Sequence, residues 1–420
     1  MEDHVFAITC ISEVSQEWNI PVWIAAVDYA KAFDTISHAS IWESLKQQQV
    51  NAQCINILQR LYRGQSGTVC CDRPSRKFNI ARGTKQGDPI SPILFNACLE
   101  TVMRNVKVTW ELKKYGLDLG HGGERLTNLR FADDLLLIGR SRKQVAKMLE
   151  DLSNASRQIG LEVHMGKTKI LYNGCGCKGG TIPGDVKVNG NKIDILGDDE
   201  STCYLGKLLS LQAIHDTEIQ HRIARAWAKF AIFKNELTDW RYPLKSRWRL
   251  FDSVVTFTLL YGCGSWTMTK KREGLLRSAQ RRMLRAILRR GRKRLPNNND
   301  EGEAELESWV EWVKRTTVEA ESLYKEFGGM DWVREQRRRK WQWAGHIARR
   351  TDERWTRRVL DWEPWGVRKR GRPCARWTDV IRKFFEDSFG ENVPTDYWKS
   401  QAQNRQTLHL SEQEFLDYCE

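Results

Sequence analysis

Acidic residues stand at two places in the chain where they could share a metal ion. Asp28 ends an apolar run at 22–27, and Asp133 and Asp134 interrupt another apolar stretch much later. Burying such carboxylates near one another is costly unless a cation neutralises them. Carboxylate oxygens suit Mg²⁺ or Mn²⁺, and two such ions about 3.5–4 Å apart can activate a hydroxyl and stabilise a leaving pyrophosphate. Each feature alone also fits a helix cap or a solvated turn, so the interpretation depends on their combination.

The pattern of apolar residues indicates which elements would carry these acids. The run at 22–27 is apolar without alternation, which is typical of an interior strand. Residues 126–139 form two apolar arms around Asp133 and Asp134, as in a hairpin whose tip carries the acids. The first half is therefore predicted to be α+β, and residues beyond 218 to be mainly helical. Further expected elements are a loop at 82–89 followed by a helix, helices over 41–61 (broken near 50–51) and 144–159, and strands within 161–172 and 187–195.

The overall charge points to a polyanionic partner. The 420 residues carry a net charge of +15, and most of this excess lies after residue 210. No apolar run approaches the roughly 18–20 residues of a membrane span, and the amino terminus lacks a signal-peptide pattern. The 11 cysteines are odd in number and lack zinc-site spacing, which favours a reduced compartment. We therefore expect an intracellular protein, in the nucleus or cytoplasm, that is neither secreted nor a membrane protein.

Several ordered motifs resemble those of the reverse transcriptases of non-LTR (LINE-type) retrotransposons. The resemblance covers most of the chain and is most specific over residues 22–210. The matching segments are 27–34 (motif A), 82–92 (motif B), Phe131-Ala132-Asp133-Asp134 (motif C), 160–169 (motif D) and Tyr204-Leu205-Gly206 (motif E). Segments at 259–263, 281–284 and 345–347 are similar to the thumb and carboxyl-terminal region of these elements.

This resemblance implies an RNA-directed DNA polymerase with a right-hand palm, an antiparallel sheet with packed helices, and a mostly helical thumb. Asp28 and Asp133 would hold the Mg²⁺ or Mn²⁺ ions, with Asp134 beside them. Phe33 would be the steric gate against a 2′-hydroxyl, although it could also be simply a core aromatic. The partners implied are an RNA template, a DNA primer and deoxynucleoside triphosphates. Gln86 and Gly87 would lie along the template and incoming nucleotide, and motif E would contact nucleic acid.

Lys167 has two interpretations. Within motif D it could protonate the leaving pyrophosphate or neutralise its charge, and it would then be counted with the catalytic residues. A Lys-Thr-Lys segment is also an ordinary solvated strand edge, and His164 stands where the family commonly has Asn.

The basic second half contains its own candidate contacts. Arg277, Arg281, Arg285 and Arg289 recur at every fourth position, with Glu273 the only acid between residues 270 and 294. Like charges at this spacing disfavour an isolated helix, so a phosphate backbone is a plausible counter-charge. Arg370-Gly371-Arg372-Pro373 is similar to the core of a minor-groove AT-hook, although short basic turns arise easily. Tryptophans interleaved with arginines after residue 330 could stack bases or form a small helical core.

We divide the chain into a palm at 1–210 with truncated fingers, a thumb-like region at 211–295, a linker at 296–302 and a basic Trp/Arg-rich helical region at 303–420. The fingers segment that precedes motif A in the family is expected to be largely missing, which would lower activity. A non-catalytic nucleic-acid-binding remnant of a retroelement is therefore the alternative function, and a group II intron maturase is a less favoured third.

Overall fold

The structure is a computed structural model, and it describes residues 2–120, 123–175, 185–197, 200–295, 305–371, 373–390 and 394–419. The expected linker at 296–302 and Arg372 lie outside the described residues. Across the described ranges, no helix combines the length and apolar character needed to cross a lipid bilayer.

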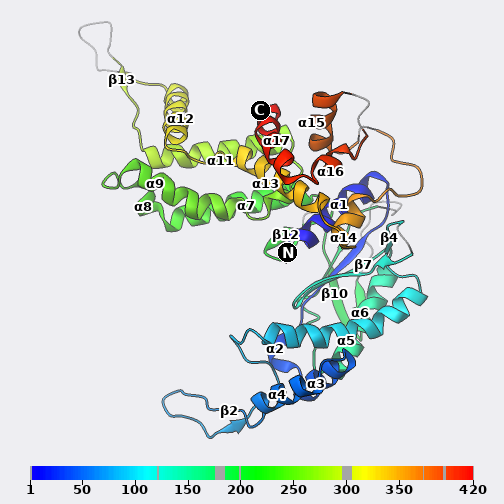
Figure 1. The fold of residues 1–420 in the computed structure, drawn as a ribbon. Helices are drawn as coiled ribbons and strands as arrows, with labels where there is room; N and C mark the ends of the chain where they lie inside the picture. The colour runs from blue at the N-terminus through cyan, green and yellow to red at the C-terminus, as the bar shows by residue number, and fades with distance from the viewer. Residues whose placement is uncertain are drawn as a thin grey trace.

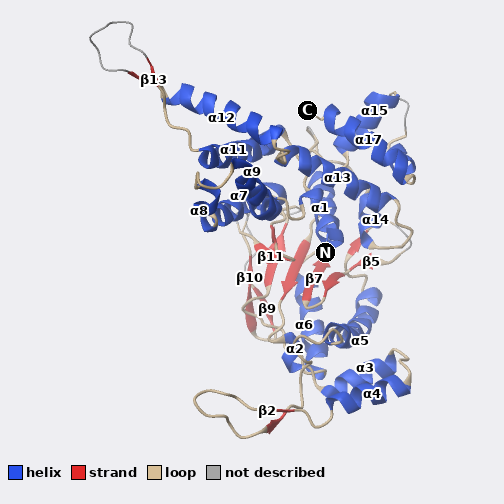
Figure 2. Ribbon diagram, turned by 60° about the vertical axis from the view of Figure 1, so that its left-hand side comes forward, coloured by secondary structure: helices blue, strands red, loops and turns tan. Residues whose placement is uncertain are grey.

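A six-stranded sheet lies at the centre of the described first half (Figures 1 and 2). Its order is β6-β7-β1-β8-β10-β9, and β1 lies between two antiparallel partners. The interior strand predicted at 22–27 is thus confirmed as β1, and the predicted hairpin is formed by β6 and β7. The bounds are β1 (Trp23–Val27), β6 (Asn128–Phe131), β7 (Asp134–Gly139), β8 (Lys169–Tyr172), β9 (Val186–Val188) and β10 (Asn191–Ile195).

Both faces of this sheet are covered, which explains why β1 shows no alternation of apolar and polar residues. One face, with Ala25 and Leu137, packs on helices α5 (Ser91–Leu112) and α6 (Arg142–Gln158). The other face, with Ile24 and Leu136, packs on helix α1 (Glu2–Glu17) and on the carboxyl-terminal region. The sheet and its helices therefore form the predicted α+β palm.

A helix pair and a hairpin extend from the palm on the side of the motif B loop (Figures 1 and 2). The predicted break near residue 50 separates α3 (His38–Gln47) from α4 (Ala52–Tyr62). Asn51 caps α4 by accepting a hydrogen bond from the Gln53 backbone N–H at 2.8 Å. This extension also contains α2 (Ala32–Thr35) and the hairpin strands β2 (Ser66–Gly67) and β3 (Phe78–Asn79), whereas β4 (Leu117–Asp118) and β5 (Arg125–Leu126) pair with each other at the other end of the palm, near α14 (Trp355–Leu360) (Figures 1 and 2).

The region after residue 210 is helical, as predicted. A hairpin of β11 (Thr202–Tyr204) and β12 (Lys207–Leu209) leads into it. Its helices are α7 (Ile214–Ile232), α8 (Lys234–Thr238), α9 (Leu244–Phe251), α10 (Phe257–Leu259) and α11 (Lys270–Leu288), with a π-helical turn η1 (Asp252–Thr256) and a 3₁₀ turn η2 (Cys263–Ser265). Ile219, Phe230 and Met283 are buried in a common core of these helices.

The hydrophobic cores run across the segment boundaries expected from the sequence. Ala320 on α12 and Trp332 on α13 belong to the thumb core, although both follow the expected linker. Trp341 and Phe415 belong instead to the core between α1 and the sheet. The elements after the linker are β13 (Arg294–Leu295) with β14 (Glu305–Leu306), α12 (Trp309–Glu326), α13 (Trp332–Ala348), α14 (Trp355–Leu360), α15 (Asp379–Phe389), α16 (Tyr397–Gln401) and α17 (Arg405–Tyr418).

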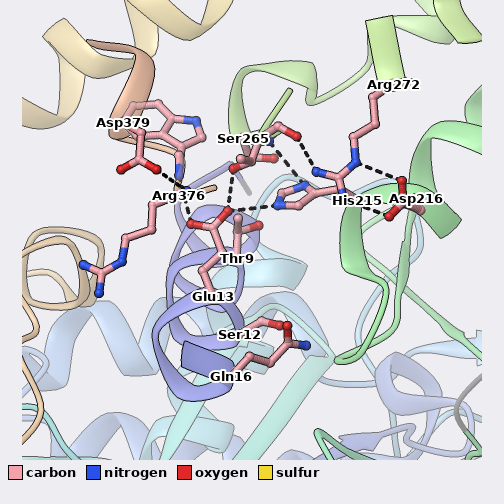
Figure 3. Close-up of polar contacts among 12 residues, drawn as sticks. Thr9, Ser12, Glu13, Gln16, His215, Asp216, Ser265, Arg272, Arg376 and Asp379 are labelled. Carbon is pink, nitrogen blue, oxygen red and sulfur yellow. Dashed lines mark hydrogen bonds and ion pairs between the residues drawn. The ribbon is translucent and has the colours of Figure 1, made fainter. Parts of the chain in front are cut away.

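Glu13 on α1 is the centre of a buried polar junction between these regions (Figure 3). Its Oε1 accepts hydrogen bonds from His215 Nε2 at 3.0 Å and Thr267 Oγ1 at 2.5 Å, and its Oε2 accepts from the Trp377 backbone N–H at 3.0 Å. Burial alone would raise the pKa of Glu13, but these bonds outweigh it and lower the pKa. An ionised carboxylate therefore ties the palm to the thumb and to the carboxyl-terminal region.

Candidate active site

The strand register brings motifs A and C together. Val27 pairs with Leu135, so Asp28 and Asp134 leave the same end of two adjacent antiparallel strands. Ala132 has φ +53° at the hairpin turn and Asp133 follows it, which places Asp133 at the tip. Burial raises the pKa of Asp134, and the charges of Asp133 and Asp28 raise it further. The three predicted acids thus lie close enough to interact.

Motif D holds Lys167 against Asp28. The His164 backbone N–H donates to the Asp28 carbonyl at 2.7 Å, and the Ala30 N–H donates to the Glu162 carbonyl at 2.8 Å. The Lys167 Nζ then lies 4.0 Å from Asp28 Oδ2. This position beside Asp28 fits the catalytic interpretation, but the Lys167 side chain is also 67% exposed, so its role stays a prediction.

The donor set suits a hard divalent cation. Asp28 Oδ2 is buried and accepts no hydrogen bond from the described residues. A buried carboxylate oxygen without a donor is costly, and a metal ion could supply the missing positive charge. Among the described residues, however, no three Asp, Glu, His or Cys side chains stand together at metal-ligating positions. The acids fit the ion chemically, but their side chains are not gathered around one point.

Motifs A, B and C line one open pocket. Phe33, Gln86, Gly87 and Asp133 all face a cavity of about 650 Å³, together with Lys31 and Lys85. The Phe33 ring also packs on Phe95, with ring centroids 4.6 Å apart. Phe33 is therefore both a core aromatic and a pocket wall, and its role as a steric gate stays a prediction.

Two glycines of the motif B loop differ in the space that surrounds them. Gly83 has φ +83°, and a Cβ there would lie 2.8 Å from the Asp34 carbonyl oxygen. The loop is held at this point by hydrogen bonds from the Gly83 and Thr84 N–H groups to the Ile36 and Phe33 carbonyls, both at 2.7 Å. Gly87 has φ +81°, but a Cβ there would meet nothing within 4 Å. Gly83 thus fixes the loop to motif A, whereas Gly87 leaves open space beside the pocket.

The motif E hairpin differs from its prediction. Tyr204 and Leu205 were expected to contact nucleic acid, but both side chains are buried. The Tyr204 hydroxyl lies 3.2 Å from His4 Nδ1, and burial followed by the charge of Asp134 raises the Tyr204 pKa. The reason is that α1 covers Tyr204, and the turn at Leu205 and Gly206 docks on the thumb. Gly206 is exposed, so it alone of the three stays open to a nucleic-acid strand.

Lys207 and Arg222 make this docking contact. Lys207 is buried, and its Nζ donates to the Gly262 carbonyl at 2.7 Å and to Ser265 Oγ at 2.6 Å. Burial lowers the pKa of Lys207 to about 8. Arg222 on α7 donates to the Gly206 carbonyl. The hairpin is therefore fixed between the palm and the thumb.

The sequence suggested that the arginines of α11 have almost no acidic partners. In the structure, they pair with acidic and polar groups of the chain itself. Helix α12, which follows the expected linker, packs along α11. Arg281 pairs with Glu321 at 2.6 Å, Arg285 donates to Thr317 Oγ1 at 2.8 Å, and Arg277 lies 3.7 Å from Glu273. Arg289 donates to the Thr238 carbonyl at 3.4 Å. The local sequence could not reveal this because two of the partners come from a helix beyond the linker.

The tryptophans after residue 330 mainly form core, which decides between the two interpretations. Trp332, Trp341, Trp377 and Trp398 are almost fully buried, whereas Trp365 is 96% exposed. Arg370 is exposed beside Arg368, whose guanidinium pairs with Glu17 at 2.5 Å. This segment therefore lies along the end of α1, and minor-groove binding by Arg370 and Arg372 stays a prediction.

His4 is a residue of this site that sequence reasoning did not single out. Its ring packs edge-on against Phe131 of motif C, with centroids 6.3 Å apart. Burial lowers the pKa of His4 to about 4, so it is neutral near neutral pH. No local pattern could have identified it, because its contacts depend on how α1 packs against the hairpins.

The chain is similar to a known protein family, to several relatives and to solved structures. Residues 7–208 match the family described as reverse transcriptase (RNA-dependent DNA polymerase). A putative uncharacterized transposon-derived protein of Caenorhabditis elegans is 33% identical over 291 residues, which are 67% of this chain and 94% of that protein. A retrovirus-related Pol polyprotein from a type-2 retrotransposable element of Drosophila melanogaster is 33% identical over 147 residues, which are 34% of this chain and 13% of the polyprotein.

A further Pol polyprotein, from a type-1 retrotransposable element of Nasonia vitripennis, is 31% identical over 36% of this chain and 14% of its own length. A solved telomerase from Candida albicans, in complex with a fragment of telomeric RNA, aligns with a TM-score of 0.40 and 12% identity over 68% of this chain and 51% of that chain. The chain thus spans nearly all of the nematode relative and a small part of each Pol polyprotein. It belongs to the reverse transcriptases of non-LTR retrotransposons.

Proposed function

We propose that this chain is an RNA-directed DNA polymerase that extends a DNA primer on an RNA template with deoxynucleoside triphosphates. The observation that carries the proposal is the meeting of four motifs at one place. Phe33, Gln86 and Asp133 line a single pocket, and Lys167 lies 4.0 Å from Asp28 beside it. Packing of a hydrophobic core alone does not require polar residues from motifs that are distant in sequence to line the same pocket.

The residues of the pocket have distinct tasks in this reaction. Phe33 forms a wall against which the sugar of the incoming nucleotide would rest, and Gly87 lets the backbone approach it closely. Lys31 and Lys85 line the same pocket and would offset the charge of the triphosphate. Lys167 would neutralise or protonate the leaving pyrophosphate.

Enzymes of this family use divalent metal ions, and we propose that Asp28, Asp133 and Asp134 hold Mg²⁺ or Mn²⁺. Bound ions of this kind activate a primer hydroxyl and stabilise the leaving pyrophosphate. Because the pKa of Asp134 is raised, ion binding should weaken as the pH falls and this carboxyl takes up a proton.

Primer extension on an RNA template with Mg²⁺ tests the proposal. Asp133→Asn should lower single-nucleotide incorporation by more than about 100-fold, because even groups that only support a metal ligand are worth 10- to 100-fold. Asp194→Asn is the matched control, since Asp194 is an exposed acid of the same sheet that pairs with Lys169 at 2.7 Å. Equal activity of the two variants would contradict the assignment of the pocket.

A non-catalytic nucleic-acid-binding remnant is the second candidate. The observation that favours it is that no three acids of the described residues stand at metal-ligating positions. In that case the chain would bind a template–primer duplex tightly and add no nucleotide, with either Mg²⁺ or Mn²⁺. The incorporation assay and a binding assay on the same preparation therefore separate the two functions.

A further inference from the structure

A second pocket lies between helices α3 and α4, outside the pocket that contains the acids. Its volume is about 460 Å³, and its lining combines aromatic, amide and cationic side chains. Nothing in the reaction described above uses it. Its residues come from the segment between motifs A and B, which the sequence motifs left without a role.

The aromatic side of the pocket is built from three rings. Tyr62 packs edge-on against His38 and Trp42, with centroids 5.1 Å and 5.5 Å apart. Trp42 is only partly buried and lines the pocket, so part of its ring surface is open. The Tyr62 hydroxyl is buried and has no hydrogen-bond partner among the described residues. Aromatic surfaces of this kind stack nucleobases, and unpaired strands present bases for stacking.

The polar side of the pocket is cationic. Arg60 and Arg63 line it, and no aspartate or glutamate of the described residues does so. Asn56 and Gln59 add side-chain amides, which can donate to and accept from a base edge. Two guanidinium groups beside an aromatic wall, without a carboxylate, match the phosphate and base of one nucleotide.

The pocket is connected to the motif B loop by two hydrogen bonds. His38 Nε2 lies 2.9 Å from the Gly83 carbonyl oxygen, and Lys85 Nζ donates to the Leu61 carbonyl at 3.2 Å. Lys85 lies over the Tyr62 ring, 5.4 Å from its centroid, and also lines the pocket of the acids. A strand leaving one pocket would therefore reach the other along the same loop.

The position of the pocket relative to the thumb indicates which nucleic-acid strand it would bind. Helices α3 and α4 lie on the opposite side of the palm sheet from thumb helices α7 and α11 (Figures 1 and 2). Most of the basic excess lies after residue 210, on the thumb side, so we expect the newly formed duplex there, and a strand that arrives from the α3–α4 side would still be unpaired. We propose that this pocket binds one unpaired nucleotide of the template ahead of the copied base, with the base on Trp42 and its phosphate on Arg60 and Arg63. This proposal rests on the proposed polymerase function.

The test measures how the full chain binds RNA–DNA duplexes with and without a single-stranded 5′ template overhang. The wild-type chain should prefer the overhang, and Trp42→Leu should reduce affinity for the overhang duplex by roughly 5- to 100-fold, which corresponds to the loss of one stacked base. The double variant Arg60→Gln/Arg63→Gln should flatten the dependence of log K on log[salt] by roughly 1.4, because each phosphate contact on a single strand contributes about 0.7. Affinity for the blunt duplex should stay unchanged in both.

A matched control removes two positive charges elsewhere. Lys46 and Lys143 are exposed and do not line the pocket, so Lys46→Gln/Lys143→Gln should keep the overhang preference. Trp42→Leu also removes packing, so circular dichroism checks its fold, and the arginine variant tests the pocket from exposed positions. As a direct readout, 5-iodouracil in the overhang should crosslink to Trp42, His38 or Tyr62.

The outcomes separate the two proposals. If the wild-type chain binds blunt and overhang duplexes equally, or if the control variant loses as much as the arginine variant, the template pocket is wrong while the polymerase function stands. If the overhang crosslinks only outside α3 and α4, the template pocket is also wrong. If the chain binds neither duplex, both proposals are overturned.

Discussion

Replacing Lys167 with methionine should strengthen the binding of a divalent ion beside Asp28. The Lys167 ammonium lies 4.0 Å from Asp28 Oδ2, an oxygen that accepts no hydrogen bond from the described residues. An ion that binds this carboxylate must compete with the ammonium group. Methionine keeps most of the length of the side chain and removes its charge, so this competition disappears.

The size of the effect follows from the distance and the exposure of the two groups. Two unit charges 4.0 Å apart attract by about 1 kcal/mol in bulk water and about 4 kcal/mol at an effective dielectric constant near 20. The Lys167 side chain is 67% exposed and the Asp28 side chain 45% exposed, so the lower value applies. We therefore expect the affinity for Mn²⁺ to rise by up to roughly fivefold, since about 1.4 kcal/mol corresponds to tenfold.

Electron paramagnetic resonance of free Mn²⁺ during a titration of the full chain measures this affinity. Lys169→Met is the control, because Lys169 lies two residues further on and pairs with Asp194 at 2.7 Å. The gain in Lys167→Met should shrink at high salt, where exposed charges are screened. Weaker Mn²⁺ binding in Lys167→Met, or the same change in both variants, would refute the placement of Lys167 at the metal site.

Three further predictions concern stability. Gly83→Ala should destabilise the chain more than Gly87→Ala in urea unfolding: both glycines have positive φ, which costs other residues about 1–2 kcal/mol, but a Cβ at Gly83 also meets a backbone oxygen at 2.8 Å. Burial lowers the pKa of Lys207 to about 8, so between about pH 8 and about pH 10.5 the unfolded chain holds a proton that the folded chain has lost. The free energy of unfolding of the wild type should therefore rise with pH in this window relative to that of Lys207→Met. A difference that does not change with pH would contradict the lowered pKa of Lys207. The raised pKa of Asp134 means that its ionisation disfavours the fold, so Asp134→Asn should raise the melting temperature near neutral pH and lose this advantage below about pH 4, where both states are protonated.

The palm and its acids could be predicted from the sequence because their signals are local. An apolar run that ends in Asp28 predicts an interior strand, and two apolar arms around Asp133 and Asp134 predict a hairpin. The sheet then needs only strand pairing to bring the acids together. The predicted helix break near residue 50 is local in the same way, because Asn51 caps the second helix.

The contacts of the thumb could not be predicted, because they join segments that are distant in sequence. The stripe of arginines on α11 had only one acid, Glu273, nearby in the sequence, yet Arg281 pairs with Glu321 across the expected linker. Tyr204 resembled a nucleic-acid contact by its motif, but α1 covers it and places His4 at its hydroxyl. Charge and motif patterns describe which groups need a partner, whereas tertiary packing decides whether that partner is a ligand or another part of the chain.

The packing of α1 has a consequence for how the polymerase assays must be done. The match to the reverse transcriptase family covers residues 7–208, but the face of the sheet with Ile24 and Leu136 is covered in part by Trp341 and Phe415. A chain cut after the matched residues would expose this apolar surface, and large exposed apolar patches promote aggregation. It would also lose His215, Thr267 and the Trp377 N–H, which are the partners of Glu13, so the polar junction that ties α1 to the thumb and the carboxyl-terminal region would be absent. Loss of activity in such a fragment would therefore report on folding, and only the full chain can test the chemistry of Asp28 and Asp133.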